Sequence, residues 1–123
     1  LGNHSGYSNN WGYKNVFIGD STGYNNEGGR FNIFIGDKVG YNNIDGAANV
    51  IVGSTAGKNN STGNGNTFLG NWSGLQNTSG SYNVYLGNKA GWNNVIGGGN
   101  VFLGNFKRFH KCFIINSSKN SGR

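Results

Sequence analysis

Residues 66–74 read Asn-Thr-Phe-Leu-Gly-Asn-Trp-Ser-Gly, and seventeen residues further on, residues 83–91 read Asn-Val-Tyr-Leu-Gly-Asn-Lys-Ala-Gly. The same core, an Asn followed by an apolar triplet and a Gly, recurs along the chain without slippage. The Asn that opens each copy stands at Asn15, Asn32, Asn49, Asn66, Asn83 and Asn100. Strict repetition at a short period is typical of a solenoid, in which each unit packs only on its neighbours.

The apolar triplets, such as Val16-Phe17-Ile18, consist of β-branched, aromatic and aliphatic residues and predict one short strand in each copy. A second, weaker strand is expected through residues 56–58 and 90–92, and the Asn-rich and Gly-rich stretches between them predict tight corners. Leu1-Gly2 matches Ile18-Gly19, so the chain starts inside a further copy. The sequence therefore predicts an all-β fold, a parallel β-solenoid or β-roll of about seven 17-residue coils over residues 1–104.

The net charge of +6 is concentrated at the C-terminal end of the chain. Residues 1–106 contain five basic and four acidic side chains, whereas the last seventeen residues contain the other five basic ones. A nucleic-acid binder is expected to carry basic charge along an extended face, so no nucleic-acid partner is predicted. Residues 105–123 are expected to form a basic cap or tail. No apolar stretch is long enough to cross a membrane, so no membrane insertion is expected.

Alternation along a strand places the first and third residues of a triplet on one face and the middle residue on the other. A thin coil has room for aliphatic side chains, so we expect the middle column to point outward: Phe17, Phe34, Ile51, Phe68, Tyr85 and Phe102. A second Gly stands four residues after the first in each copy: Gly6, Gly23, Gly40, Gly57, Gly74 and Gly91. A second aromatic-rich column follows it: Tyr7, Tyr24, Tyr41, Lys58, Leu75 and Trp92. The opening Asn column is expected to be structural, an amide ladder in which each side chain bonds the next.

Outward aromatic side chains of roughly 200 Å² each would leave an apolar stripe of about 1,000 Å². Soluble monomers rarely expose so large a patch, which predicts that the stripe contacts further copies of the chain. Two monomeric alternatives remain. The aromatic stripe could be a flat platform for carbohydrate, including a surface glycan, or it could bind ice, although the regular Thr columns expected of an ice-binding face are missing.

The copies at residues 66–74 and 83–91 resemble the head repeats of trimeric autotransporter adhesins. They are still more similar to the Asn-Thr-Phe-Leu-Gly-x-x-Ala-Gly repeats of bacterial surface proteins and phage tail fibres that precede an intramolecular chaperone domain. Residues 112–118, Cys-Phe-Ile-Ile-Asn-Ser-Ser, are similar to the segment that follows the last repeat in such fibres. The resemblance covers residues 1–104 and implies a parallel β-roll of three chains, located on a cell or virion surface and mediating attachment. The period of seventeen is longer than in the better-known adhesin heads.

Catalytic, metal and cofactor sites are not expected. His4 and His110 are about a hundred residues apart, and the single Cys112 favours an incidental thiol over a nucleophile. Residues 53–58, Gly-Ser-Thr-Ala-Gly-Lys, have three residues between the glycines where a phosphate loop needs four. Asp20 and Asp37 occupy one column, but the Gly-Gly-x-Gly-x-Asp pattern of calcium-binding rolls is absent.

These patterns together favour a structural or adhesive repeat segment of an extracellular, cell-surface or virion fibre that associates with itself through the outward aromatic ladder. The alternatives are a subunit of a self-polymerising extracellular filament and a monomeric carbohydrate- or ice-binding solenoid. No enzyme activity is expected from any of these residues.

Overall fold

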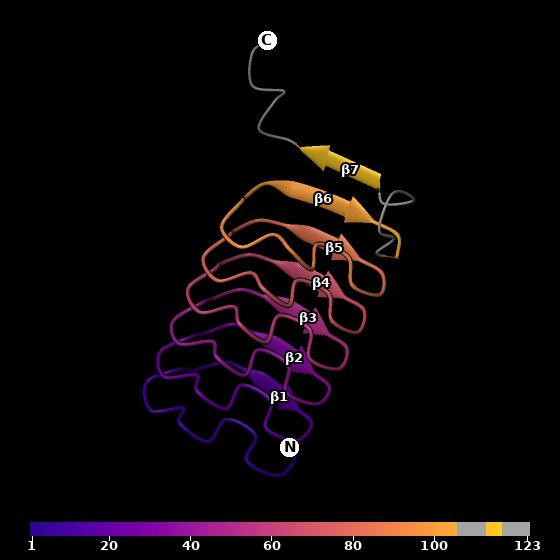
Figure 1. Cartoon of the computed structure of the whole chain (residues 1–123). Coiled ribbons are helices and arrows are strands. Elements are labelled where there is room, and N and C mark those ends of the chain that lie inside the picture. The colour runs from indigo at the N-terminus through magenta and orange to yellow at the C-terminus, as the bar shows by residue number, and fades with distance from the viewer. Residues whose placement is uncertain (106–112, 117–123) are drawn as a thin grey trace.

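The computed structural model describes residues 1–105 and the backbone of residues 113–116. Six parallel strands form one sheet in sequence order, as the stack of arrows in Figure 1 shows. The strands are β1 (Val16–Ile18), β2 (Ile33–Ile35), β3 (Val50–Val52), β4 (Thr67–Leu69), β5 (Val84–Leu86) and β6 (Asn100–Leu103). The predicted all-β parallel β-solenoid is confirmed, with about five turns and no helix among the described residues. The chain accordingly has no helix there that could span a membrane.

The register of the sheet follows the repeat directly, because neighbouring strands pair equivalent positions of adjacent copies. Phe17 pairs with Phe34, and Phe68 pairs with Tyr85. The first copy adds no strand, although the carbonyl of Leu1 accepts a hydrogen bond from the N–H of Gly19 (2.8 Å) at the position where a strand would pair. The described residues therefore contain six parallel strands, and the expected seven coils are not seen among them.

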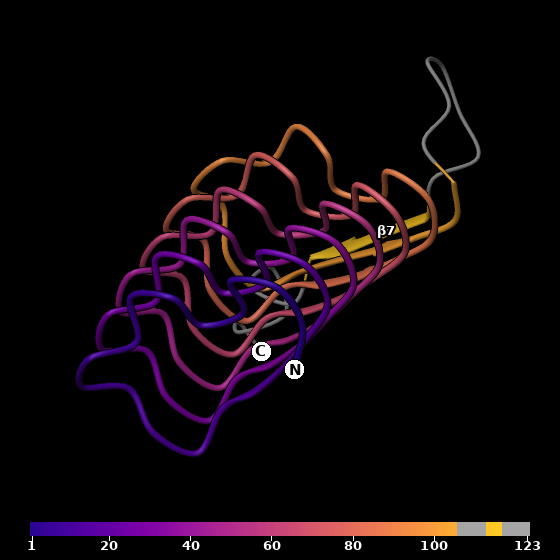
Figure 2. The ribbon, with the colours of Figure 1, turned by 90° about the horizontal axis from the view of Figure 1, so that it is seen from below.

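The return path of each coil contains no second strand, contrary to the sequence prediction for residues 56–58 and 90–92, which lie in turns. Gly57 and Gly91 have φ values of 55° and 63°, a left-handed conformation that an extended strand cannot contain. Backbone hydrogen bonds still connect the stacked turns, for example from the N–H of Gly23 to the carbonyl of Val39 (2.9 Å). Figure 2 shows the coils following similar paths one beyond another, and Figure 1 shows β1 to β6 stacked on one side of them.

The strand faces are inverted relative to the sequence prediction. The middle residues of β2 to β5 are buried and form the core with Val39, Ala56 and Ala90, and Phe17 and Phe102 pack against it partly buried. The first and third residues are exposed or half-buried. Phe34 is fully buried, whereas Val16 and Ile18 are 45% and 39% exposed. The second glycine of each copy explains the inversion, since a Cβ at Gly40 would lie only 2.4 Å from Cε2 of Phe34. The missing side chain at this position makes room for an inward ring.

The glycine that ends each strand serves a different purpose, the close approach of successive coils. Gly70 has a φ of 137°, and a Cβ there would lie 2.4 Å from the carbonyl oxygen of Gly87 in the next coil. Any larger residue would push the two coils apart, so this column sets the spacing of the stack.

A seventh strand, β7 (Phe113–Asn116), pairs antiparallel with β6, so that Val101 lies opposite Ile115. This strand lies within the predicted cap, residues 105–123. The remainder of that prediction, residues 106–112 and 117–123 with His110 and Cys112, falls outside the described residues.

Candidate interaction faces

The outer side of the sheet is a flat aliphatic surface, here called the aliphatic face. Its first column is Val16, Ile33, Val50, Thr67, Val84 and Val101. Its second column is Ile18, Ile35, Val52, Leu69, Leu86 and Leu103. Thr67 is the sole polar residue among these positions, and none is charged. All of them are exposed or half-buried, so an apolar surface lies where the sequence analysis had placed the core.

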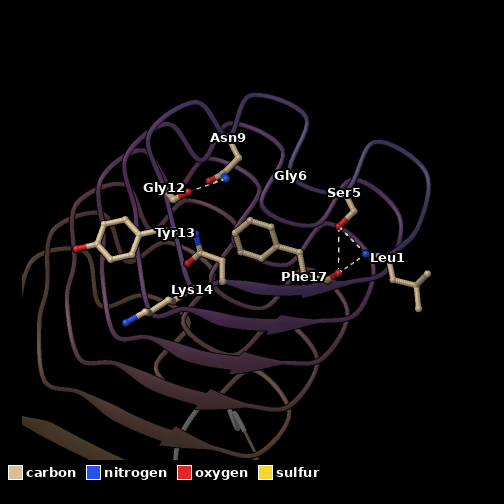
Figure 3. A pocket seen from close by; sticks show the side chains of 9 residues that line it. Leu1, Ser5, Gly6, Asn9, Gly12, Tyr13, Lys14 and Phe17 are labelled. Carbon is tan, nitrogen blue, oxygen red and sulfur yellow. Dashed lines mark hydrogen bonds between the residues drawn. The ribbon is translucent and has the colours of Figure 1, made fainter.

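The two columns of the aliphatic face form parallel ridges along the solenoid. Residues two apart in a strand are separated by about 6.7 Å, and neighbouring strands by about 4.8 Å. Leu1 extends the second ridge beyond β1, with its side chain pointing away from the coil interior in Figure 3. It is 88% exposed.

Charged side chains flank the aliphatic face with opposite signs in the first two coils. Lys14 and Arg30 precede β1 and β2, and both are exposed. Asp20 and Asp37 follow the same two strands at the other corner and are also exposed. Asp37 forms a 3.9 Å ion pair with Lys38, whose side chain is 47% exposed. The face therefore has a basic margin before the strands and, after them, an acidic margin that also carries Lys38 and, beside β5, Lys89.

The aromatic column expected outside the sheet is a buried stack. Phe68 and Tyr85 lie 4.6 Å apart between ring centroids with an interplanar angle of 4°, and Tyr85 and Phe102 lie 4.8 Å apart. Phe17 and Phe34 stack at 5.2 Å, and Ile51 separates the two runs of rings. These spacings are close to the coil repeat of about 4.8 Å. The predicted role of this column as an outward interface or ligand face is therefore wrong.

Tyr85 is the one buried phenol in this stack. Its hydroxyl accepts a hydrogen bond from Nδ2 of Asn94 (2.6 Å), which also donates to the carbonyl of Gly97 (2.8 Å). Burial raises the pKa of Tyr85 above the ordinary value of 10.0, and the bond from Asn94 opposes this shift. The phenol therefore keeps its proton over the whole range in which exposed tyrosines are neutral.

The second aromatic column does lie at the surface, on the return path opposite the sheet. Tyr7, Tyr24 and Tyr41, here called the tyrosine ladder, stack at 5.0 and 4.9 Å with interplanar angles of 7° and 6°. Nζ of Lys58 lies 6.0 Å from the ring centroid of Tyr41 and continues the column. Because the rings cover one another, the ladder presents ring edges and hydroxyls to solvent, and a sugar ring has few free faces on which to stack. Leu75 and Trp92, further along the column, are half-buried.

A polar column runs beside the tyrosine ladder. Nδ2 of Asn25 donates to Oδ1 of Asn42 (3.0 Å), and Nδ2 of Asn42 donates to Oδ1 of Asn59 (3.0 Å). These amides are half-buried. The return side of the solenoid is thus a surface of phenol and amide groups, in contrast to the aliphatic face.

Asparagine ladders hold the coils together inside the solenoid, but the continuous side-chain ladder is not the predicted one. It is formed by a second Asn column, Asn9, Asn26, Asn43, Asn60 and Asn77. In this column Nδ2 of Asn43 donates to Oδ1 of Asn26 (2.6 Å) and Nδ2 of Asn60 to Oδ1 of Asn43 (3.0 Å). Asn77 continues this ladder by donating to Asn60 (2.7 Å). Each of these amides also donates to the carbonyl of the glycine three residues later; Nδ2 of Asn43, for example, donates to the carbonyl of Gly46 (3.0 Å).

The opening Asn column is structural, as expected, but it mainly bonds backbone. Oδ1 of Asn15 accepts the backbone N–H of Asn32 (2.9 Å), and its Nδ2 donates to the carbonyl of Gly29 (2.8 Å). The same pattern recurs at Asn32, Asn49, Asn66 and Asn83, and Asn100 donates its N–H at the end of the column. A direct side-chain bond within the column joins Asn49 to Asn32 (3.1 Å). Both Asn columns together satisfy polar groups that stacking would otherwise bury unpaired.

A hollow of about 330 Å³ opens at the N-terminal end of the stack, where no coil covers the first one (Figure 3). Phe17 and Asn15 line it, and the N-terminal ammonium of Leu1 donates to the carbonyl of Phe17 (2.5 Å). Equivalent residues of later coils, such as Phe34 and Asn32, are fully buried. The hollow is therefore the uncovered end of the repeat.

The acidic and histidine residues form no cluster among the described residues: no three of the His, Cys, Asp and Glu side chains there lie close enough to hold a metal ion. Asp20 and Asp37 are exposed at their corner. Residues 53–58, the stretch that superficially resembles a phosphate loop, include the repeat glycines Gly53 and Gly57. Gly53 allows close approach to Gly70 of the next coil, and Gly57 makes room for the side chain of Ile51, as the equivalent glycines do in the other coils.

Comparison of this chain with models of protein families, with curated proteins and with solved structures gives no match. The resemblance to adhesin heads and fibre repeats therefore depends on the residues of the repeat alone.

Proposed function

We propose that this chain is a stiff structural segment of a surface fibre, extracellular or on a virion, and that it associates with copies of itself through the aliphatic face. The observation that supports the proposal is the exposure of two continuous aliphatic ridges on a six-stranded parallel sheet. The repeat and the Asn ladders explain the stiffness, because every coil is bonded to the next by backbone and side chains.

The size of the aliphatic face sets the strength expected of this association. Three residues at about 3.3 Å and six strands at about 4.8 Å give a plane of about 290 Å². This is about the size of the largest apolar patch on a typical monomer, and it is less than half of the roughly 800 Å² per partner found in standard stable interfaces. Association of the isolated segment should therefore depend on concentration, and a rod with more coils should associate more strongly.

The association is tested by removing apolar area from the face without touching the core. Val50→Ser and Leu69→Ser replace one residue of each ridge, and the mass in solution is followed by light scattering over a range of concentrations. We expect the double variant to remain folded and to need a much higher concentration to assemble. A wild-type chain that stays at the mass of one copy at every concentration would refute self-association.

The matched control for this experiment lies on the opposite side of the coil. Tyr24→Ser and Asn42→Ser change two residues of the return path, which the proposed contact does not use. If assembly were lost in the control but kept in the face variant, the contact would lie on the return side instead of the aliphatic face.

Attachment to a glycan is a second candidate function, favoured by the tyrosine ladder and the amides of Asn25, Asn42 and Asn59. These groups offer hydrogen-bond donors and acceptors at a regular spacing along the rod. A glycan array probed with the folded chain tests it. Binding that disappears in the Tyr24→Ser and Asn42→Ser variant, with assembly unchanged, would support adhesion at the return side.

A further inference from the structure

We infer that two copies pair face to face about a two-fold axis parallel to the solenoid axis, so that their coils stack in the same direction and in register. This inference rests on the proposed self-association and adds the number of chains, their direction and the residues that align them. Its basis is the juxtaposition of the uncharged aliphatic face with a basic margin on one side and an acidic margin on the other.

Symmetry favours a pair over a ring of three. A contact in which a surface meets the same surface of the partner is isologous and closes with two chains, whereas a three-fold ring requires each surface to meet a different one. The described chain has one flat aliphatic surface, and the return side presents the tyrosine ladder and the Asn25–Asn42–Asn59 amides. The aliphatic face therefore finds its apolar counterpart on a second copy of itself.

The repeat makes such a pair self-complementary. Both copies carry ridges about 6.7 Å apart with a coil spacing of about 4.8 Å, so the ridges of one copy meet those of the other at the same spacing along the whole contact. Sheets that pack in this way lie about 10 Å apart, a separation that exposed side chains at the margins can span.

The charged margins select between the two possible directions of the pair. With parallel solenoid axes, the strands of the two copies run in opposite directions, and the margin before the strands of one copy lies over the margin after the strands of the other. Lys14 then faces Asp20 of the second copy, and Arg30 faces Asp37. Two-fold symmetry repeats both pairs. With antiparallel axes, like margins would meet. Lys14 and Arg30 would then have no opposite partner among the described residues, and only Asp37 would face a basic residue, Lys89.

The charged residues of the two margins remain available to pair with the second copy, because their contacts within the chain are exposed. Nζ of Lys14 lies 5.4 Å from the ring centroid of Phe31, an exposed cation–π contact that keeps the ammonium at the margin. Asp37 contacts Lys38 at 3.9 Å, and both side chains are about half exposed, so the carboxylate can also accept a hydrogen bond from an arginine. Exposed ion pairs contribute little individually, and their effect here is on direction and register.

Two charge-reversal variants test the arrangement. The first, Lys14→Glu with Arg30→Glu, makes both margins acidic, and the second, Asp20→Lys with Asp37→Lys, makes both margins basic. Each variant alone places like charges opposite one another in the parallel pair, so we expect its association to be about tenfold weaker or worse at low salt. An equimolar mixture of the two restores opposite charges at every position and should recover the two-chain mass.

Sedimentation at several concentrations separates the possible outcomes, with circular dichroism to confirm that each variant keeps its fold. Glu27→Lys with Lys58→Glu is the control, since it also reverses two charges but leaves both margins intact, and it should associate like the wild type. A wild-type mass of one chain would refute the proposed function itself. A mass of three chains would leave self-association standing and overturn the two-fold pair. Two chains with no recovery in the mixture would overturn the parallel direction.

Discussion

The inward position of the aromatic column predicts a large difference between two adjacent residues, Phe68 and Leu69. Phe68 is fully buried and stacks on Tyr85 at 4.6 Å, whereas Leu69 lies on the aliphatic face and is 39% exposed. Truncation of a buried phenylalanine to alanine costs about 3–5 kcal/mol. For Leu69→Ala we expect about 1 kcal/mol, because much of this side chain already contacts water and its loss leaves no enclosed cavity.

Urea unfolding of both variants, followed by far-ultraviolet circular dichroism at a concentration where the chain is monomeric, measures this difference. The midpoint should fall far more for Phe68→Ala than for Leu69→Ala. Phe68→Leu serves as a milder variant if the alanine variant fails to fold, and it should also exceed Leu69→Ala in cost. Equal losses, or a larger loss at Leu69, would refute the assignment of the two strand faces.

Three further predictions concern the turns, the buried ladder and the buried phenol. Gly40→Ala should destabilise the chain by about 1–3 kcal/mol, because its Cβ would collide with the core and φ at this position is 56°. Ala48→Gly should instead stabilise the chain by up to about 1 kcal/mol, because φ at Ala48 is 59°. Thermal unfolding of the two variants tests this difference. Asn43→Asp should lower the free energy of unfolding by well over 1 kcal/mol at neutral pH, since a buried amide that donates two hydrogen bonds becomes a carboxylate. Asn42→Asp, in the half-buried ladder, should lower it less. Similar urea midpoints for the two variants would contradict this prediction. Because folding raises the pKa of Tyr85, the unfolded chain releases this proton above about pH 10 while the folded chain retains it. The free energy of unfolding should therefore fall above that pH, and the fall should be shallower in Tyr85→Phe.

The sequence alone determined the architecture of the repeat. The period of seventeen fixed the pairing of Phe17 with Phe34 and of Phe68 with Tyr85, because equivalent positions of a solenoid must stack. The strand triplets and the glycine-ended corners could also be predicted, since β-branched and aromatic residues favour strands and glycine alone adopts the φ of 137° found at Gly70. The parallel sheet follows from these local preferences combined with strict repetition.

The assignment of the two strand faces was decided only by the tertiary structure. In a triplet such as Val50-Ile51-Val52, all three residues are apolar, so alternation leaves two possible orientations and polarity does not choose between them. The choice depends on the space inside the coil, which the turn creates where Gly57 passes close to the side chain of Ile51. A glycine six residues after each middle residue was the sequence signal for this space, and its meaning required the path of the turn.

The same physical reason separates the two Asn columns. Both recur every seventeen residues, and the sequence could not show which amides stack on one another and which bond backbone. The stack brings Asn43 within 2.6 Å of Asn26, while Asn15 meets the N–H of Asn32. Composition and period thus determined that the chain forms a bonded stack of coils, whereas the packing of rings over glycines determined which apolar surface remains exposed.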